Sequence, residues 1–490
     1  MRGNRRRRLA ASYRNWITGR KLTPVSRRLA RPVLLLATGV VLVLALAYAV
    51  PLPSRLRQPG SSQVLFRDGS PAHVFLAPDD RWRIPVTWKE IDPAYLEALI
   101  RLEDRRFWHH PGVDPIAIAR AAFQNLGRGR VVSGASTITM QLVRVLEPRP
   151  RTLVSKGIEA LRALQIELRL SKQEILEAYL QFIPFGRNVE GIEAAALSYF
   201  GHRAAALSDA EIATLLAVPQ DPNGRHPRIE HLGRLRAARD DIARRLYALG
   251  VMPRATGGSA DRGLEELISS PVPDRLRPFP RLIPHAATWL RARQSGRMRI
   301  VTTLDRGLQQ LAERTLAGNR NEAALKGIHN GAIVLVDRST TEVRALVGNF
   351  DFWDEAHAGQ IPGFDTRRAV GSTLKPFLYA LAIDRGLALP GFLVPDLPRQ
   401  FGAYTPGNFD GKFEGIVRLE DALSRSLNLP FVSLLNQIGV ESFLGALSTL
   451  GARGLNPTPG HYGLSVAAGS LEMSPLELAG LYTTLANEGL

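Results

Sequence analysis

The spacing of apolar residues along the chain changes twice, and the changes separate three kinds of structure. Residues 32–53 contain no charged side chain and are rich in Val, Leu and Ala, which is about the length that crosses a bilayer as a helix. Residues 93–249 carry Ala, Leu, Glu and Arg at three- and four-residue spacings, which is typical of helices. After residue 298, strand-like runs at 299–303, 331–337 and 343–347 precede helical stretches. We therefore predict a membrane anchor, an all-α domain and an α+β domain, in that order.

Turn-forming residues refine these boundaries. A small hairpin with an Asp-Gly turn is expected within residues 64–76, and Pro and Gly become frequent between residues 250 and 298. The predicted segments are a basic arm, an anchor, a linker with the small hairpin, the helical domain, a second linker and the α+β domain. Their respective bounds are 1–31, 32–53, 54–85, 86–249, 250–298 and 299–490.

The charge distribution favours a membrane protein over a nucleic-acid-binding one. The formal net charge is +18, but the first 31 residues are rich in Arg and contain no acid, and no nucleic-acid-binding motif accompanies them. A basic flank before the apolar segment predicts a cytoplasmic N-terminus with the rest of the chain outside. A cleaved signal peptide is the alternative, but its apolar run would be shorter. The sequence has no Cys, which permits an oxidising compartment without requiring one.

One acidic residue in the helical domain stands out because of its neighbours. On a helix over residues 95–107, Glu103 falls on the apolar face together with Phe107. A carboxylate in such surroundings is partly shielded from water and suited to proton transfer. Spacing alone favours a plainer interpretation, in which Glu103 forms a structural ion pair with Arg101 or Arg106.

Five short motifs in the helical domain resemble, in order, the signatures of the family-51 peptidoglycan glycosyltransferases. They occupy residues 103–112, 134–141, 156–159, 174–180 and 187–201. Members of that family have a lysozyme-like helical domain that lies against the membrane. They polymerise lipid II, a disaccharide-peptide on undecaprenyl pyrophosphate, into β-1,4 glycan strands and release undecaprenyl pyrophosphate. The resemblance implies the same fold and reaction for this chain.

The resemblance also implies roles for individual residues. Glu103 would be the general base for the 4-hydroxyl of the acceptor sugar, and Glu159 a second essential carboxylate. Whether Glu159 holds a metal, the substrate or Lys156 stays open, and a surface pair with Lys156 is the structural alternative. Lys156, Arg187 or a divalent metal such as Mg or Mn could stabilise the pyrophosphate, and no cofactor is obligatory. The implied substrate-binding residues are Asp104, Phe107, His110, Ser136, Thr137, Gln141, Lys156 and Arg187, although Phe107 could simply belong to the core.

A candidate nucleophile lies in the α+β domain. Ser372 begins the only Ser-x-x-Lys motif of the chain, and Lys375 would lie on the same helical face, where its amine can activate the hydroxyl. Pro376 fits only if the helix starts near Ser372. With the triplet from Ser426 to Asn428, these residues resemble the class A penicillin-binding proteins and their β-lactamase-like transpeptidase domain. The resemblance implies that a stem peptide ending in D-Ala-D-Ala, or penicillin, acylates the serine, and that the second motif relays protons and orients substrate.

A third motif of that family, Lys-Thr-Gly or Lys-Ser-Gly, does not follow, and no lysine occurs after Lys412. We therefore expect a partial transpeptidase domain whose activity is doubtful. The alternatives are a monofunctional polymerase with a relic domain, an inert membrane-anchored wall-binding scaffold, and a muramidase-like hydrolase. The expected partners are lipid II, nascent glycan, stem peptide, penicillin and the membrane, with no nucleic acid. The expected location is the bacterial inner membrane, with a single pass, a cytoplasmic N-terminus and periplasmic catalytic domains.

Overall fold

The structure is a computed structural model that describes residues 38, 48–128, 136–252, 260–456, 458 and 460–489. The basic arm and nearly all of the predicted anchor lie outside the described residues, as do the first two positions of the motif at 134–141. No single helix among the described residues is long and apolar enough to cross a membrane; one bent pair, Leu429–Ile438 with Val440–Thr449, meets those criteria with an 87° bend between its helices.

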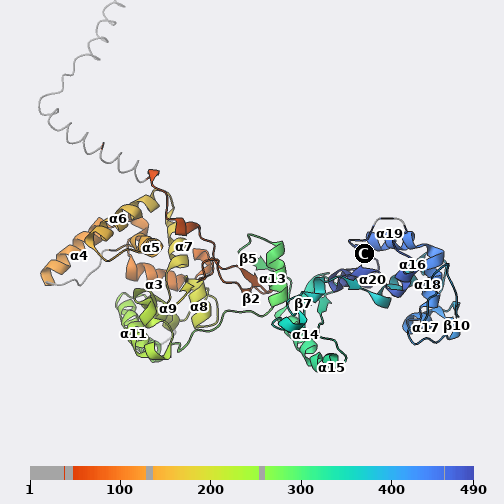
Figure 1. The fold of residues 1–490 in the computed structure, drawn as a ribbon. Helices are drawn as coiled ribbons and strands as arrows, with labels where there is room; N and C mark the ends of the chain where they lie inside the picture. Colours follow the sequence, from red (N-terminus) through yellow and green to blue (C-terminus); the bar gives the residue numbers. More distant parts are fainter. Residues whose placement is uncertain are drawn as a thin grey trace, which may run out of the picture. The chain divides into compact units, whose positions relative to one another are not determined.

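The chain forms two compact units (Figure 1). Met1–Ser61 and Leu76–Pro278 make up the first, and Ser62–Phe75 and Phe279–Leu490 the second. The first unit is helical, as predicted. Its α-helices are α3 (Pro93–Glu103), α4 (Pro115–Arg128), α5 (Ile138–Leu146), α6 (Leu153–Glu167), α7 (Lys172–Phe182), α8 (Ile192–Tyr199), α9 (Asp209–Ala217), α10 (Pro222–Arg225), α11 (Leu232–Ala248) and α12 (Ala260–Ser269). The short strands β3 (Trp82–Arg83) and β4 (Val189–Glu190) pair in parallel.

Helix α5 is central to the part of this unit that carries the predicted motifs. It packs against both α6 and α7, while α9 packs against α11 on the other side of the unit. Six of its nine residues are buried, so the helix is held by packing as well as by its own hydrogen bonds. Thr137 caps its N-terminus by accepting a hydrogen bond from the Met140 amide. Side chains on its first two turns are therefore fixed in position.

The second unit combines short strands with helices. Its strands are β1 (Gln63–Leu65), β2 (Pro71–Val74), β5 (Arg299–Val301), β6 (Ile333–Val336), β7 (Val343–Val347), β8 (Arg368–Ala369), β9 (Leu393–Asp396), β10 (Gly415–Arg418) and β11 (Glu472–Met473). Its α-helices are α13 (Pro284–Arg293), α14 (Arg306–Gly318), α15 (Arg320–Leu325), α16 (Lys375–Asp384), α17 (Leu419–Ser424), α18 (Leu429–Ile438), α19 (Val440–Thr449) and α20 (Pro475–Ala486).

The predicted hairpin is present and becomes part of a larger sheet. Strands β1 and β2 are antiparallel, and Gly69 has the positive φ of 80° that the Asp-Gly turn requires. Strand β5, far away in sequence, adds in parallel to β1, giving the order β2-β1-β5. The predicted runs at 331–337 and 343–347 form the antiparallel pair β6–β7. The pairs β9–β10 and β8–β11 were not predicted, because strands of two to four residues leave almost no periodic signal.

One predicted helix ends earlier than expected. We predicted a continuous helix over residues 95–107, but α3 ends at Glu103 and Phe107 starts the 3-10 helix Phe107–His109. The chain leaves the helix because Asp104 adopts non-helical angles (φ −156°, ψ 76°). The Asp104 carboxylate accepts a hydrogen bond from the Ile138 amide at 3.0 Å. Glu103 is thus the last residue of α3 and lies directly beside this link to α5.

Candidate active site

Glu103 is held by a chain of two hydrogen bonds that crosses three helices. The Gln141 Nε2 on α5 donates to Glu103 Oε2 at 2.8 Å. The Tyr179 hydroxyl on α7 in turn donates to Gln141 Oε1 at 3.1 Å. No other hydrogen bond to the Glu103 carboxylate comes from the described residues, so Oε1 is free to receive a proton. A carboxylate fixed on one side and open on the other has the geometry of a general base.

The second predicted carboxylate is also held by α5. Glu159 on α6 is buried and accepts hydrogen bonds from Arg144 Nε at 2.9 Å and Arg144 Nη2 at 2.8 Å. This bidentate pair fixes the plane of the guanidinium. Among the described residues, the ion-pair partner of Glu159 is therefore Arg144, which the sequence did not suggest, and not Lys156. Gln141 and Arg144 are three residues apart, so α5 presents both from one face.

A cleft of about 840 Å³ opens beside Glu103 and is rich in cations. Glu190 lies in its wall and binds Arg55 and Arg83 closely, with Arg81 at 3.6 Å. Among the described residues, Arg151 and Arg187 have no acidic partner. The arginines that line the cleft are Arg55, Arg81, Arg144, Arg151 and Arg187. The cleft therefore carries more positive charge than its two acids can neutralise, which suits a polyanionic ligand.

A second cleft of about 360 Å³ shares Glu103, Ser136 and Gln141 with the first. Asp104 and Thr137 line it as well, together with Arg101, Arg105, Arg106, Arg120 and Arg245. Glu103 therefore stands between two cation-rich spaces, so the carboxylate can act on a group that reaches it from either one.

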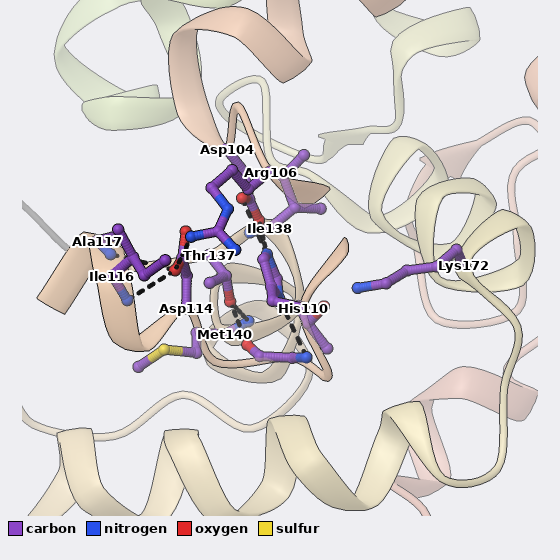
Figure 2. A network of polar contacts seen from close by, with 12 residues as sticks. Asp104, Arg106, His110, Asp114, Ile116, Ala117, Thr137, Ile138, Met140 and Lys172 are labelled. Carbon is purple, nitrogen blue, oxygen red and sulfur yellow. Dashed lines mark hydrogen bonds and ion pairs between the residues drawn. The ribbon is translucent and has the colours of Figure 1, made fainter. Parts of the chain in front are cut away.

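Asp104, His110 and Thr137 form the buried network that supports this arrangement (Figure 2). The Gly112 amide donates to His110 Nδ1 at 3.1 Å, so His110 Nε2 carries the proton and donates to Asp104 at 3.0 Å. The Thr137 hydroxyl donates to the Gly112 carbonyl at 2.5 Å. The network joins the end of α3 to the start of α5, and so it sets the separation of Glu103 and Gln141.

The structure does not bring every predicted residue to the clefts. Phe107 and His110 are buried and line neither of them, and Lys172 lies 4.5 Å from the Phe107 ring centroid. Lys156 is exposed on α6 and also lines neither cleft. Ser136, Gln141 and Arg187 do line the larger cleft.

Sequence reasoning overlooked Tyr179 and several arginines. Tyr179 lies in the motif at 174–180, where a buried aromatic residue on a helix resembles core. Arg144 could have been found, because it follows Gln141 by three residues on a predicted helix. Arg55 offers no local signal, since it comes from a linker and reaches the cleft only in the folded chain.

Of the residues predicted around Ser372, hydrogen bonds bring Lys375, Ser426 and Asn428 together, whereas among the described residues none joins Ser372 to Lys375. Ser372 lies in the 3-10 helix Gly371–Leu374, which runs directly into α16 at Lys375, and Pro376 occupies the first turn as expected. The Lys375 Nζ donates to the Ser426 carbonyl at 2.7 Å, to Ser426 Oγ at 3.2 Å and to Asn428 Oδ1 at 2.8 Å. Burial lowers the pKa of the Lys375 amine to about 8. A substantial fraction of this amine is therefore neutral at mildly alkaline pH and able to take a proton.

A buried carboxylate positions the second motif. Asp396 on β9 is fully buried and accepts hydrogen bonds from Asn408 Nδ2 at 2.9 Å and from the Glu414 amide at 2.9 Å. Asn408 Oδ1 in turn accepts from the Asn428 amide at 2.7 Å. The loop before β10 is thereby tied to the residue that holds Lys375.

The donor set of the clefts does not favour a metal ion. Among the described residues there is no group of three or more His, Asp or Glu side chains arranged to hold one. Glu159 and Glu190 are occupied by arginines, and Asp104 by His110 and the Ile138 amide. These residues do not fit a divalent cation, and we derive no step through one.

Comparison with known proteins defines the class. A transglycosylase family model matches residues 68–247, and a penicillin-binding protein transpeptidase domain model matches residues 331–490. The chain therefore belongs to the class A penicillin-binding proteins, in which a helical transglycosylase domain precedes a transpeptidase domain.

Among individual relatives, the chain is 40% identical over 426 residues to penicillin-binding protein 1C of Escherichia coli (strain K12), covering 87% of this chain and 54% of the relative. It is 32% identical over 421 residues to penicillin-binding protein 1F of Bacillus subtilis (strain 168), covering 83% of this chain and 57% of the relative. The crystal structure of penicillin-binding protein 1A from Haemophilus influenzae aligns with a TM-score of 0.43 and 16% identity, over 89% of this chain and 68% of that one. The chain spans little more than half the length of the two curated relatives.

Proposed function

We propose that the first unit is a peptidoglycan glycosyltransferase that polymerises lipid II into β-1,4 glycan strands. The observation that carries this proposal is the Glu103 carboxylate, which Gln141 fixes on one side and which stands between two arginine-lined clefts. Of the described acids that line these clefts, Glu103 is the one with neither a cationic nor a backbone partner, while several cations can receive an anionic leaving group.

The reaction follows from this arrangement. Glu103 accepts the proton of the 4-hydroxyl of the acceptor sugar as that oxygen forms a bond to the anomeric carbon of the growing chain. The bond between the anomeric carbon and the pyrophosphate oxygen breaks on the opposite face, with inversion, and undecaprenyl pyrophosphate leaves with the bonding electron pair. Arg151 and Arg187 are available to the phosphates, and Glu159 holds Arg144 in a fixed orientation at the same cleft.

The muramidase-like alternative receives less support. Glycoside hydrolysis uses a pair of carboxyl groups, one of which acts on water or on the sugar. The other acids around these clefts are engaged: Asp104 with His110, Asp114 with Arg106, and Glu190 with arginines. A single carboxylate available as a base, beside a cation-rich cleft, supports glycosyl transfer with an anionic leaving group instead of hydrolysis.

We also propose that this unit works at the surface of the bacterial inner membrane, with residues 32–53 as a single-pass anchor and the catalytic units in the periplasm. Apolar side chains, which folding usually buries away from water, are exposed on α4 and α6. Leu153 and Val154 are 89% and 75% exposed, and Ile116, Phe123 and Leu161 are also exposed. Exposed apolar residues concentrated on two helices support contact with lipid, where a lipid-linked substrate would reside.

For the second unit, we propose a D,D-transpeptidase domain that acts on stem peptides and binds penicillin. Ser372 would be the nucleophile and Lys375 the base, with Ser426 and Asn428 holding the lysine amine. The lowered pKa of Lys375 and its three hydrogen bonds support this assignment.

The experiment for the glycosyltransferase is Glu103→Gln, which keeps the shape of the side chain and removes the base. Polymerisation of lipid II should fall at least about a hundredfold while lipid II binding persists. Glu97→Gln is the matched control, because Glu97 lies on the same helix, is exposed and pairs only loosely with Arg101 at 3.7 Å. Full polymerisation by Glu103→Gln would remove Glu103 from the mechanism.

A further inference from the structure

We propose that Tyr179 is a positioning residue for the glycosyltransferase: its hydroxyl sets the orientation of the Gln141 amide and, through it, the position of the Glu103 carboxylate. The inference rests on the proposed function, because it concerns the base of that reaction. The three side chains come from α7, α5 and α3 and are joined by hydrogen bonds of 3.1 and 2.8 Å.

An orienting donor is needed because a glutamine amide has two ends of nearly equal shape and opposite polarity. With the Gln141 NH₂ toward Glu103, the carboxylate receives a hydrogen bond. With the amide turned over, the Gln141 oxygen would face the carboxylate and repel it. The Glu103 carboxylate favours the first orientation by accepting from the NH₂, and a donor on the far side of the amide reinforces it; the Tyr179 hydroxyl is that donor.

Tyr179 is suited to this task because it keeps its proton. The side chain is almost fully buried, and burial, together with the nearby Glu103 carboxylate, raises the pKa of Tyr179 well above its usual value. The hydroxyl therefore remains a neutral donor throughout the pH range in which the enzyme could work.

The two helices that carry the relay are themselves fixed. Helix α7 begins with a capping box formed by Ser171 and Glu174, and α5 is capped by Thr137. The two helices pack against each other. The distance from Tyr179 to Gln141 is consequently set by the fold, so the hydroxyl can orient the amide before any substrate binds.

The test is Tyr179→Phe in the full chain, assayed by steady-state polymerisation of fluorescent lipid II. We expect kcat to fall about three- to tenfold, which corresponds to the loss of one neutral hydrogen bond, with KM changed less than about twofold. Tyr199→Phe is the matched control, because Tyr199 is as deeply buried, its hydroxyl donates to the Phe185 carbonyl, and it lines neither cleft. The control should retain the wild-type kcat.

A double-mutant cycle separates positioning from other roles. If Tyr179 acts through Gln141, then Tyr179→Phe should change kcat less than about twofold once Gln141→Leu has removed the amide. Equal effects of Tyr179→Phe in both backgrounds would overturn the proposal, because they would indicate a direct contact with substrate or a general loss of stability. An unchanged kcat in the single variant would overturn it as well.

A structural readout keeps this inference separate from the proposed reaction. In a crystal structure of Tyr179→Phe, Gln141 should no longer lie within hydrogen-bond distance of Glu103, whether or not the protein polymerises lipid II. An unaltered contact between Gln141 and Glu103 would contradict the positioning role. A wild-type protein without polymerase activity would instead count against the proposed function.

Discussion

The contact between Glu159 and Arg144 leads to a prediction that separates activity from stability. Replacing Glu159 with Gln retains one acceptor oxygen but removes the charge and places an NH₂ group against the guanidinium, which itself can only donate. Hydrogen bonds to charged groups contribute about 1.5–3 kcal/mol. The Arg144 side chain is 38% exposed and can recover part of its hydration. We therefore expect Glu159→Gln to lower the free energy of unfolding by about 1–2 kcal/mol.

The matched variant is Glu167→Gln on the same helix. Glu167 is as buried as Glu159, with 7% of each side chain exposed, and it also binds one cation, Lys172 at 2.7 Å. It lines neither cleft. Urea unfolding, monitored by circular dichroism, should show a similar decrease in the free energy of unfolding for both variants. Only Glu159→Gln should also lose polymerisation, by at least about tenfold, because Arg144 is then no longer fixed at the cleft. Equal activity of the two variants would refute the assignment of Glu159 as the residue that orients Arg144.

Three further predictions concern other parts of the chain. Burial lowers the pKa of Lys375 to about 8 from 10.5, so the unfolded chain holds more protons between these values. The free energy of unfolding should therefore rise with pH across that interval, by up to about 3 kcal/mol relative to Lys375→Met. If urea titrations gave the same pH dependence of unfolding free energy for wild type and Lys375→Met, the prediction would be contradicted. Asp396→Asn should destabilise the second unit by about 2 kcal/mol in the same assay, because the new NH₂ faces the Asn408 and Glu414 donors. Val154→Asp combined with Leu161→Asp should weaken sedimentation with anionic vesicles, and unchanged sedimentation would argue against α6 as a lipid-contacting surface.

Much of this fold was predictable because the apolar spacing is regular. The helical segment at 93–249, the hairpin with its Asp-Gly turn and the pair β6–β7 follow from periodicity and turn chemistry. The early end of α3 was not predictable, because it depends on the Asp104 carboxylate binding the Ile138 amide from a distant segment. Local propensity carries no information about such a contact.

For the candidate site, the sequence indicated which residues take part but not which residues they form hydrogen bonds or ion pairs with. Spacing alone favoured an ion pair for Glu103, which could be selected because it begins a motif that resembles the family-51 glycosyltransferases, and the structure places it at two clefts. Lys156 was a plausible partner of Glu159 by helical spacing, yet the partner is Arg144 from α5. Helical spacing identifies neighbours on one helix, whereas this ion pair depends on how two helices pack. The same limit explains why Tyr179 was overlooked.

The most direct test of the account is the product that the purified full-length protein makes from lipid II in detergent or vesicles. The account predicts long β-1,4 glycan strands, one undecaprenyl pyrophosphate released for each bond formed, and loss of both products in Glu103→Gln. Shortening of preformed glycan, or the same yield of long strands from Glu103→Gln, would contradict it.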